Sequence, residues 1–209
     1  KLYSEKKINP SDDIMSAWIE AESEGLKDGS DFGLDQIISD CLLLLDGGAE
    51  TTRTVIARSM LHLANSPTQW ELLKKGSDLE IAVEEFIRYV TPIHNMCRVA
   101  TEDYFIHGKT IRKGDQVVLM YSSANRDSEK FNNPELLDVT RDPNHHIAFG
   151  FGTHFCLGAS LARLEIKLFY EQLINRVKSF ALAGDPVEMP NAFVYGLASC
   201  PMDLTPETN

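Results

Sequence analysis

The sequence has few cysteines and no excess of positive charge. Its four cysteines, in 209 residues, include no Cys-x-x-Cys pair, which argues against a structural zinc site and a disulfide framework. The formal net charge is −11, and an acidic chain disfavours nucleic acid as a partner. We therefore expect a reduced, cytoplasmic protein that does not bind nucleic acid.

Long hydrophobic runs are also lacking. The longest dense apolar run is residues 41–45, whereas crossing a bilayer takes ~20 apolar residues, so we expect no membrane span. No apolar stretch follows the lysine-rich residues 1–7, so we expect no signal peptide. Gly150-x-Gly152 lacks the third glycine of a dinucleotide-binding turn, so we expect no flavin or nicotinamide site.

Apolar residues recur at helical spacing over most of residues 12–92. Residues 42–45 are apolar on every side of their helix, which indicates a central, buried helix. Ser66-Pro67 is typical of a helix start, because serine caps helices and proline favours the first position. The predicted helices span residues 12–24, 32–63, 67–75 and 79–90, with a loop at 25–31.

The helical spacing of apolar residues ends near Pro92. Short β-like runs alternate with the turn signals His107-Gly108 and Lys113-Gly114. Residues 122–146 form a polar meander without periodicity, which is typical of a functional or wrapping segment. A helix is predicted through 161–177, then a hairpin with its tip near Gly196. The pattern predicts a fold that is mainly α with small β-sheets.

Cys156 follows a glycine-rich run and precedes an amphipathic helix. A helix N-terminus presents free N–H groups and partial positive charge, which favour the thiolate, the form that binds metal. The glycines carry no Cβ and allow a flat ligand to approach closely. Taken by itself, a single cysteine is more often a small apolar filler of the core, and that alternative stays open on the thiol alone.

The ten residues from Phe149 to Gly158 resemble, position for position, the haem-ligand signature of the cytochromes P450. The family's iron ligand is a cysteine thiolate, so the resemblance implies that Cys156 binds the iron of haem b. It also implies that residues which shape the loop contact the cofactor. These are Phe149, Gly150, Gly152 and Gly158.

The resemblance implies the C-terminal haem-binding half of a cytochrome P450 fold, with residues 1–209 forming part of one domain. Within it, 12–92 would be helical with a central oxygen-binding helix, and 95–146 β-rich with the meander. Residues 147–209 would hold the haem loop, the proximal helix and the terminal hairpin. The family's chain is about twice as long, so this half alone would expose the central helix and hold haem weakly.

Two upstream motifs extend the resemblance. Glu85-Phe86-Ile87-Arg88 alone would be an ordinary ion pair, because residues three apart share a helix face. It resembles the family's Glu-x-x-Arg element, which implies a structural cluster of Glu85, Arg88 and Arg141. Here Leu137 departs mildly from the aromatic residue that is usual in the family.

Gly47-Gly48-Ala49-Glu50-Thr51 resembles the family's oxygen-binding stretch. Two glycines inside a helix cost roughly 1 kcal/mol each relative to alanine, and close helix packing is the plain alternative explanation. The resemblance implies instead that Gly47 and Gly48 open the helix over the cofactor. Glu50 and Thr51 would relay protons to dioxygen as the catalytic pair.

Further residues are implied to surround the cofactor and the substrate. Arg98 and His154 match positions that bind haem propionates through charged hydrogen bonds. The other histidines have no ligand-like arrangement, and His145-His146 are read as surface or loop residues. The implied substrate pocket is apolar and includes Ile93, Met96, Phe193 and Val194.

The resemblance implies a monooxygenase that hydroxylates an unactivated C–H of a hydrophobic small molecule. It would use O2 and two electrons from a ferredoxin and a ferredoxin reductase. Residues 95–98, 150–155 and 191–197 resemble actinobacterial members of the family that hydroxylate the side chain of steroids and sterols such as cholesterol. Terpene, fatty acid and polyketide substrates, or an inactive haem-binding fragment, are the alternatives. Glu50 and Thr51 disfavour a peroxide-driven enzyme.

Overall fold

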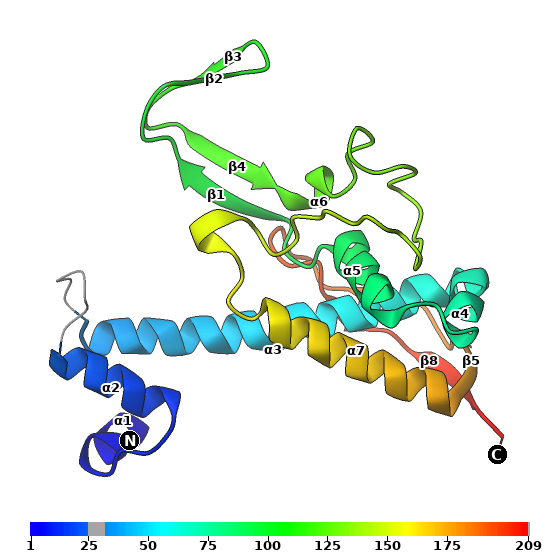
Figure 1. Ribbon diagram of the computed structural model, residues 1–209, viewed down its shortest axis with the longest axis horizontal. Coiled ribbons are helices and arrows are strands. Elements are labelled where there is room, and N and C mark those ends of the chain that lie inside the picture. Colours follow the sequence, from blue (N-terminus) through cyan, green and yellow to red (C-terminus); the bar gives the residue numbers. More distant parts are fainter. Residues whose placement is uncertain (25–31, 209) are drawn as a thin grey trace. The chain divides into compact units, whose positions relative to one another are not determined.

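The computed structural model describes residues 1–24 and 32–208 (Figure 1). The predicted loop at 25–31 lies outside the described residues. The chain divides into two compact units, Lys1–Ala49 and Glu50–Asn209, and helix α3 (Leu34–Ala64) crosses the boundary between them. The predicted division at residues 92 and 146 stays a prediction.

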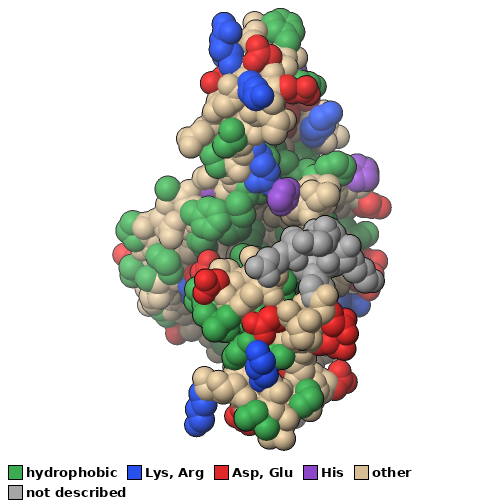
Figure 2. Space-filling view, turned by 90° about the vertical axis from the view of Figure 1, so that its left-hand side faces the viewer, with side chains coloured by type: hydrophobic (Ala, Val, Ile, Leu, Met, Phe, Trp, Pro, Cys, Tyr) green, Lys and Arg blue, Asp and Glu red, His purple; other side chains and the backbone are tan. Residues whose placement is uncertain are grey.

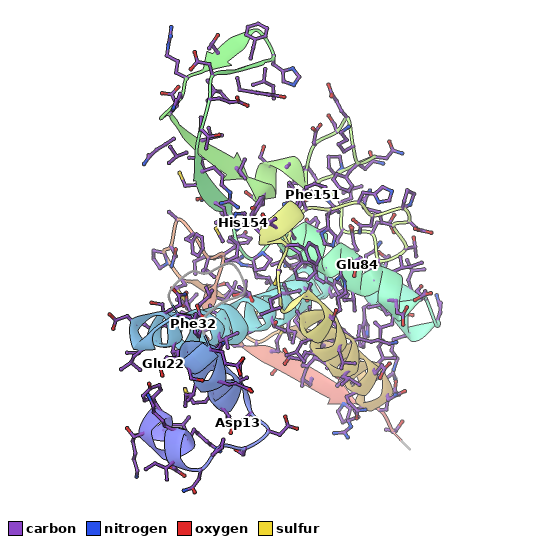
Figure 3. The ribbon with its side chains drawn as sticks, turned by 60° about the vertical axis from the view of Figure 1, so that its left-hand side comes forward. Asp13, Glu22, Phe32, Glu84, Phe151 and His154 are labelled. Atoms are coloured by element: carbon purple, nitrogen blue, oxygen red, sulfur yellow. The ribbon has the colours of Figure 1, made fainter. Side chains whose placement is uncertain are left out.

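The first unit contains helices α1 (Leu2–Ile8) and α2 (Ile14–Glu24) and the beginning of α3. Helix α2 begins where the Asp13 carboxylate accepts a hydrogen bond of 2.8 Å from the Ser16 N–H, which confirms the start predicted at the paired aspartates. Helix α1 was not predicted, because its apolar residues do not recur at helical spacing. This short helix packs on α2, and the Tyr3 hydroxyl donates to the Glu22 carboxylate. Figure 3 labels Glu22 on α2.

Helix α3 is α-helical without a break through Gly47 and Gly48. The expectation that residues 42–45 are buried is wrong: Leu43 exposes 69% and Leu45 70% of its surface. No described part of the chain covers these leucines, which agrees with the exposure expected of this half alone. Figure 2 shows hydrophobic side chains at the surface of one face of the molecule.

Three helices of the second unit confirm the predicted pattern, namely α4 (Pro67–Lys74), α5 (Leu79–Val90) and α7 (Ala159–Arg176). Helix α5 begins where the Asp78 side chain accepts from the Glu80 N–H at 2.8 Å. It ends at Thr91, whose φ of 44° is left-handed.

The core of the second unit is formed by buried side chains of α3, α4, α5 and α7, and α5 packs on α7. Phe86 of α5 stacks on Tyr170 of α7 with ring centroids 4.5 Å apart, and both side chains are fully buried. Burying a large apolar side chain contributes about 1.5–3 kcal/mol, so the contact between Phe86 and Tyr170 stabilises the unit.

Two antiparallel sheets follow α5. Strand β1 (Asn95–Val99) pairs with β4 (Gln116–Met120), and β2 (Tyr104–Ile106) pairs with β3 (Lys109–Ile111). The β2–β3 hairpin turns at His107-Gly108, as predicted, with positive φ at both residues, and projects beyond β1 and β4 (Figure 1). The one-turn helix α6 (Tyr121–Ala124) then leads into the meander.

The C-terminal region is more extended than expected. Strand β5 (Val177–Leu182) pairs with β8 (Met202–Pro206), a pairing that the sequence analysis missed, and α7 ends one residue early because Val177 begins β5. Strand β6 (Val187–Glu188) pairs with β7 (Leu197–Ser199) to form the terminal hairpin. Gly196 lies at the base of this hairpin and not at its tip, because the Met189 N–H donates to the Gly196 carbonyl at 3.2 Å.

The packing of His62 on α3 predicts a loss of stability at mildly acidic pH. Burial, with the positive charges of Arg58 and Arg126, lowers the pKa of His62 from 6.5 to about 4. The folded chain therefore binds fewer protons than the unfolded chain between these values. The free energy of unfolding therefore has its full value above pH 6.5, where His62 is neutral in both states, and it decreases as the pH falls toward 4.

His62→Phe keeps a ring against Tyr89, whose centroid lies 4.8 Å away, and removes the titrating group. We expect the variant to lose less stability than the wild type between pH 7 and pH 4, by on the order of 2 kcal/mol. Urea unfolding at both pH values measures the difference. Identical pH dependence in the two proteins would contradict the assignment.

Candidate functional site

The loop before α7 has a tight backbone path centred on Cys156. The Cys156 N–H donates to the Phe149 carbonyl at 2.9 Å, and Phe155 N–H to Gly152 at 3.0 Å. Gly150 has a φ of 75°, and a Cβ there would lie 3.2 Å from the His154 carbonyl oxygen. The loop therefore requires glycine at this position. Figure 3 shows Phe151 and His154 on this loop, where Gly152–His154 form the short helix η1.

The Cys156 thiol is exposed immediately before α7, which begins at Ala159, and the Ala159 N–H donates to the Cys156 carbonyl at 3.3 Å. Apolar neighbours are exposed with it: Phe151 by 88% and Leu157 by 90%. In the described residues, no three His, Cys, Asp or Glu side chains gather as a metal site. A cysteine sulfur exposed among apolar side chains is chemically suited to the iron of a haem.

Arg98 and His154, the predicted propionate ligands, lie on β1 and on η1. The Arg98 guanidinium donates to the neighbouring Cys97 carbonyl at 2.9 Å. Neither residue forms an ion pair within the described part of the chain. Both side chains could therefore bind a carboxylate without breaking an existing pair.

Glu85, Arg88 and Arg141 form one buried ion cluster, as the motif suggested. The Arg88 guanidinium donates to both Glu85 oxygens, at 2.7 and 2.8 Å, and both side chains are 0% exposed. Arg141 from the meander donates to Glu85 Oε2 at 3.0 Å. The Asp138 N–H and the Asn144 amide complete the shell around the carboxylate, at 2.9 and 3.1 Å.

The two arginines of this cluster also hold the meander backbone. Arg88 Nη1 donates to the carbonyls of Asn125 and Pro134, at 2.7 and 3.0 Å. Arg141 Nη1 donates to the Asn132 carbonyl at 2.8 Å. A segment without helix or strand thereby satisfies several of its carbonyl groups through the guanidinium groups of Arg88 and Arg141.

The sequence analysis missed a second cluster, centred on Glu84. Arg163 of α7 donates to both Glu84 oxygens, at 2.5 and 3.0 Å, and the His146 ring lies 3.0 Å from Oε2. His146 lies in a loop, which is one of the two predicted alternatives, but it is not a surface residue, because only 3% of its side chain is exposed. The adjacent acids Glu84-Glu85 were the available signal.

Glu84 is electrostatically linked to the cysteine loop. Burial acts to raise the pKa of Glu84, but the hydrogen bonds from His146 and Arg163 outweigh it and lower the pKa to about 2. The same two partners flank Phe149: the Arg163 guanidinium lies 4.6 Å from the ring centroid, and the His146 ring 6.0 Å. Because the Phe149 carbonyl accepts a hydrogen bond from the Cys156 N–H, this cluster fixes the start of the loop. Figure 3 labels Glu84 on α5.

On α3, the carboxylate of Glu50 is paired with the guanidinium of Arg53, with Nε 3.1 Å from Oε2. Thr51 is the next residue along the helix. Among the described residues, a Cβ on Gly47 or Gly48 would meet no atom within 4 Å, so steric exclusion of a side chain by these residues does not account for the two glycines.

Three of the predicted pocket residues lie together. Ile93 and Val194 form an antiparallel bridge, and the His94 N–H donates to the Phe193 carbonyl at 2.9 Å. Met96 lies three residues further along, on β1. The loop after Pro92 and the terminal hairpin thus meet through backbone hydrogen bonds, 100 residues apart in sequence.

A family model described as Cytochrome P450 matches residues 3–201. A steroid C26-monooxygenase of Mycolicibacterium smegmatis is 40% identical over 208 residues, which is 98% of this chain and 51% of that protein. The polyketide biosynthesis cytochrome P450 PksS of Bacillus subtilis is 39% identical over 98% of this chain and 51% of its own length. The chain spans about half the length of the curated relatives it matches.

A solved structure supports the same likeness. CYP109E1 from Bacillus megaterium in complex with testosterone matches with a TM-score of 0.84 at 35% identity, over 96% of this chain and 55% of that one. Within residues 1–24 and 32–208, no helix has the length and apolar character needed to cross a membrane.

Removing the charge of Glu85 should destabilise the fold strongly. Glu85→Gln keeps the volume but leaves two arginines, Arg88 and Arg141, without a carboxylate. We expect a loss of about 3–5 kcal/mol in the free energy of unfolding, measured by denaturant titration.

The matched control is Glu135→Gln. Glu135 pairs with Arg126 at 3.1 Å but is 75% exposed. Its loss should cost less than ~1 kcal/mol. Equal losses in the two variants would show that the buried cluster is not the stabilising one.

Proposed function

Because the chain belongs to the cytochrome P450 family, we propose that the protein is a haem-thiolate monooxygenase that hydroxylates a C–H bond of a hydrophobic substrate. The observation that carries the proposal is the geometry of the Cys156 loop. An exposed thiol precedes the N-terminus of α7, among exposed apolar side chains, on a backbone path that Gly150 makes possible.

In this proposal haem b is the cofactor, and Cys156 supplies the thiolate ligand. Phe149, Gly150, Gly152 and Gly158 shape the loop beside it. Arg98 and His154 bind the two propionates, since neither has an acidic partner within the described residues. When bound, haem supplies the activation of dioxygen, while the protein orients substrate and delivers protons.

Glu50 and Thr51 serve as the proton relay. Glu50 holds or releases a proton at its carboxylate, and the Thr51 hydroxyl passes it toward the cofactor. Gly47 and Gly48 leave the preceding turn without side chains, so the backbone can approach the cofactor. The paired geometry of Glu50 and Arg53 supports a defined position for the acid.

The substrate class that we propose is a steroid, with a side-chain carbon as the site of hydroxylation. The 40% identity to a steroid C26-monooxygenase and the likeness to a testosterone-bound structure support it. Ile93, Met96, Phe193 and Val194 supply an apolar surface for such a ligand. Polyketide hydroxylation is the competing proposal, supported by a relative of nearly equal identity.

Two electrons per turnover would come from a ferredoxin and its reductase. The sequence carries no flavin or nicotinamide fingerprint of its own, which supports separate donors. The relatives described above are bacterial, and we propose a cytoplasmic location for this protein as well.

Cys156→Ser should abolish the thiolate spectrum of the haem-loaded protein. We expect the wild type, reduced and exposed to CO, to show a thiolate-type Soret band, and the variant to lack it. Cys97→Ser is the control, because Cys97 is also exposed but lies on β1. If the wild-type protein lacks this band, the monooxygenase proposal is wrong and the chain is an inactive haem-binding fragment.

Substrate class is tested by titrating the haem-loaded protein with cholest-4-en-3-one. We expect a high-spin Soret shift that saturates, and a weaker affinity in Val194→Ala because part of the apolar surface is lost. Removing two buried methyl groups should cost about 1–2 kcal/mol, or roughly 5–30-fold in Kd. If only a terpene, fatty acid or polyketide produces the shift, the steroid assignment is wrong.

A further inference from the structure

The base of the terminal hairpin, residues 195–197, lies against the Glu50 carboxylate of α3. A Cβ added to Gly196 would lie 3.0 Å from Glu50 Oε1 and 3.1 Å from Met189 Cε. Gly196 does not have a positive φ, so its backbone conformation would accept any residue. Close approach to Glu50 and Met189 is therefore the reason for glycine at this position.

Arg53 joins the same carboxylate to the hairpin. Its Nε and Nη2 donate to the two Glu50 oxygens, and its Nη1 donates to the Leu197 carbonyl at 3.2 Å. Arg53 and Glu50 expose 47% and 30% of their side chains, so the pair adds little stability. A two-pronged hydrogen bond does, however, fix the direction of a carboxylate.

Arg58 holds the hairpin base in place from the next turn of α3. Its side chain is 1% exposed, and it donates to the carbonyls of Tyr195 and Gly196, the latter at 3.2 Å. The guanidinium also lies 3.1 Å from the centroid of the Tyr195 ring and pairs with Glu188. The backbone that contacts Glu50 therefore cannot shift without disturbing a buried charge.

The backbone segment before β7 leads directly into the proposed substrate surface. The Tyr195 N–H donates to the Pro92 carbonyl at 2.9 Å, and Val194 bridges to Ile93. The Asn191 side chain accepts from the Phe193 N–H at 2.7 Å. Residues 193 and 196 are only ~10 Å apart along an extended chain.

We propose that the hairpin base, through Gly196 and Arg53, sets the direction of the Glu50 carboxylate, and that substrate contact at residues 193–194 is transmitted along the hairpin to Glu50. Gly196 and Arg53 are then positioning residues. The inference rests on the proposed function, in which Glu50 is the acid of the proton relay. It adds that substrate binding and proton delivery are coupled through the terminal hairpin.

The test compares Gly196→Ala with Gly184→Ala in the haem-loaded protein. A Cβ at Gly184 would meet Pro201 at 3.8 Å, an ordinary contact, so this control adds a methyl group to the same tail without touching Glu50. We expect Gly196→Ala to lower kcat by roughly 10–100-fold with KM nearly unchanged, because a displaced acid transfers protons poorly. Gly184→Ala should match the wild type.

A second readout does not depend on turnover. It is the 13C chemical shift of the Glu50 carboxyl, followed by NMR in the reduced, CO-bound protein with and without cholest-4-en-3-one. We expect the steroid to move this resonance in the wild type and in Gly184→Ala, and to leave it unmoved in Gly196→Ala. Arg53→Met should abolish the response, and Arg53→Lys should restore part of it.

The outcomes separate the inference from the proposed function. If Gly196→Ala matches Gly184→Ala in both readouts, the hairpin does not position Glu50 and the inference is overturned. It is also overturned if the resonance is displaced while kcat is unchanged. Failure of the proposed function has another signature, a wild type without the thiolate band, and the NMR response to steroid then decides the inference by itself.

Discussion

A single buried carboxylate, that of Glu85, organises the second unit of the chain. A charge at 0% exposure must be compensated on every side, and here five donors from α5 and the meander surround it. Compensation of the Glu85 charge depends on the meander, a long irregular segment. The meander can supply Arg141, Asn144 and the Asp138 N–H only when it is folded against α5. Formation of the meander is thus tied to formation of the helix.

The consequence extends to the cysteine loop. The meander ends at His146, and His146 and Arg163 both contact Glu84, the neighbour of Glu85 on α5. Phe149 lies between these two partners and accepts the backbone hydrogen bond of Cys156. Two adjacent acids on one helix therefore fix the meander and the start of the loop that carries the thiol.

The longer helices and the cysteine loop were predictable from sequence because their signals are local, whereas the short helices α1 and α6 were not predicted. Apolar spacing located α5, and the run from Phe149 to Gly158 identified the loop. The missed features depend on distant partners: β5 pairs with β8 across some twenty residues, and Glu84 meets Arg163 of α7. Gly196 was placed at a hairpin tip because glycine is typical of turns, whereas its contact with Glu50 is visible only in three dimensions. Leu42 to Leu45 were wrongly predicted to be buried for a related reason. The local sequence shows that these side chains are apolar, but it does not show whether another segment packs on them.

Helix α3 is continuous in geometry but uneven in what stabilises it. Near its C-terminal end, Val55 and Leu63 are buried and Arg58 is bound by the hairpin. Leu197 and Gly196 of the hairpin are bound from the same stretch of α3 by Arg53 and Arg58. Because Glu50 lies one turn before Arg53, the position of its carboxylate depends on this attachment of α3 to the hairpin, and a change in either element reaches the acid.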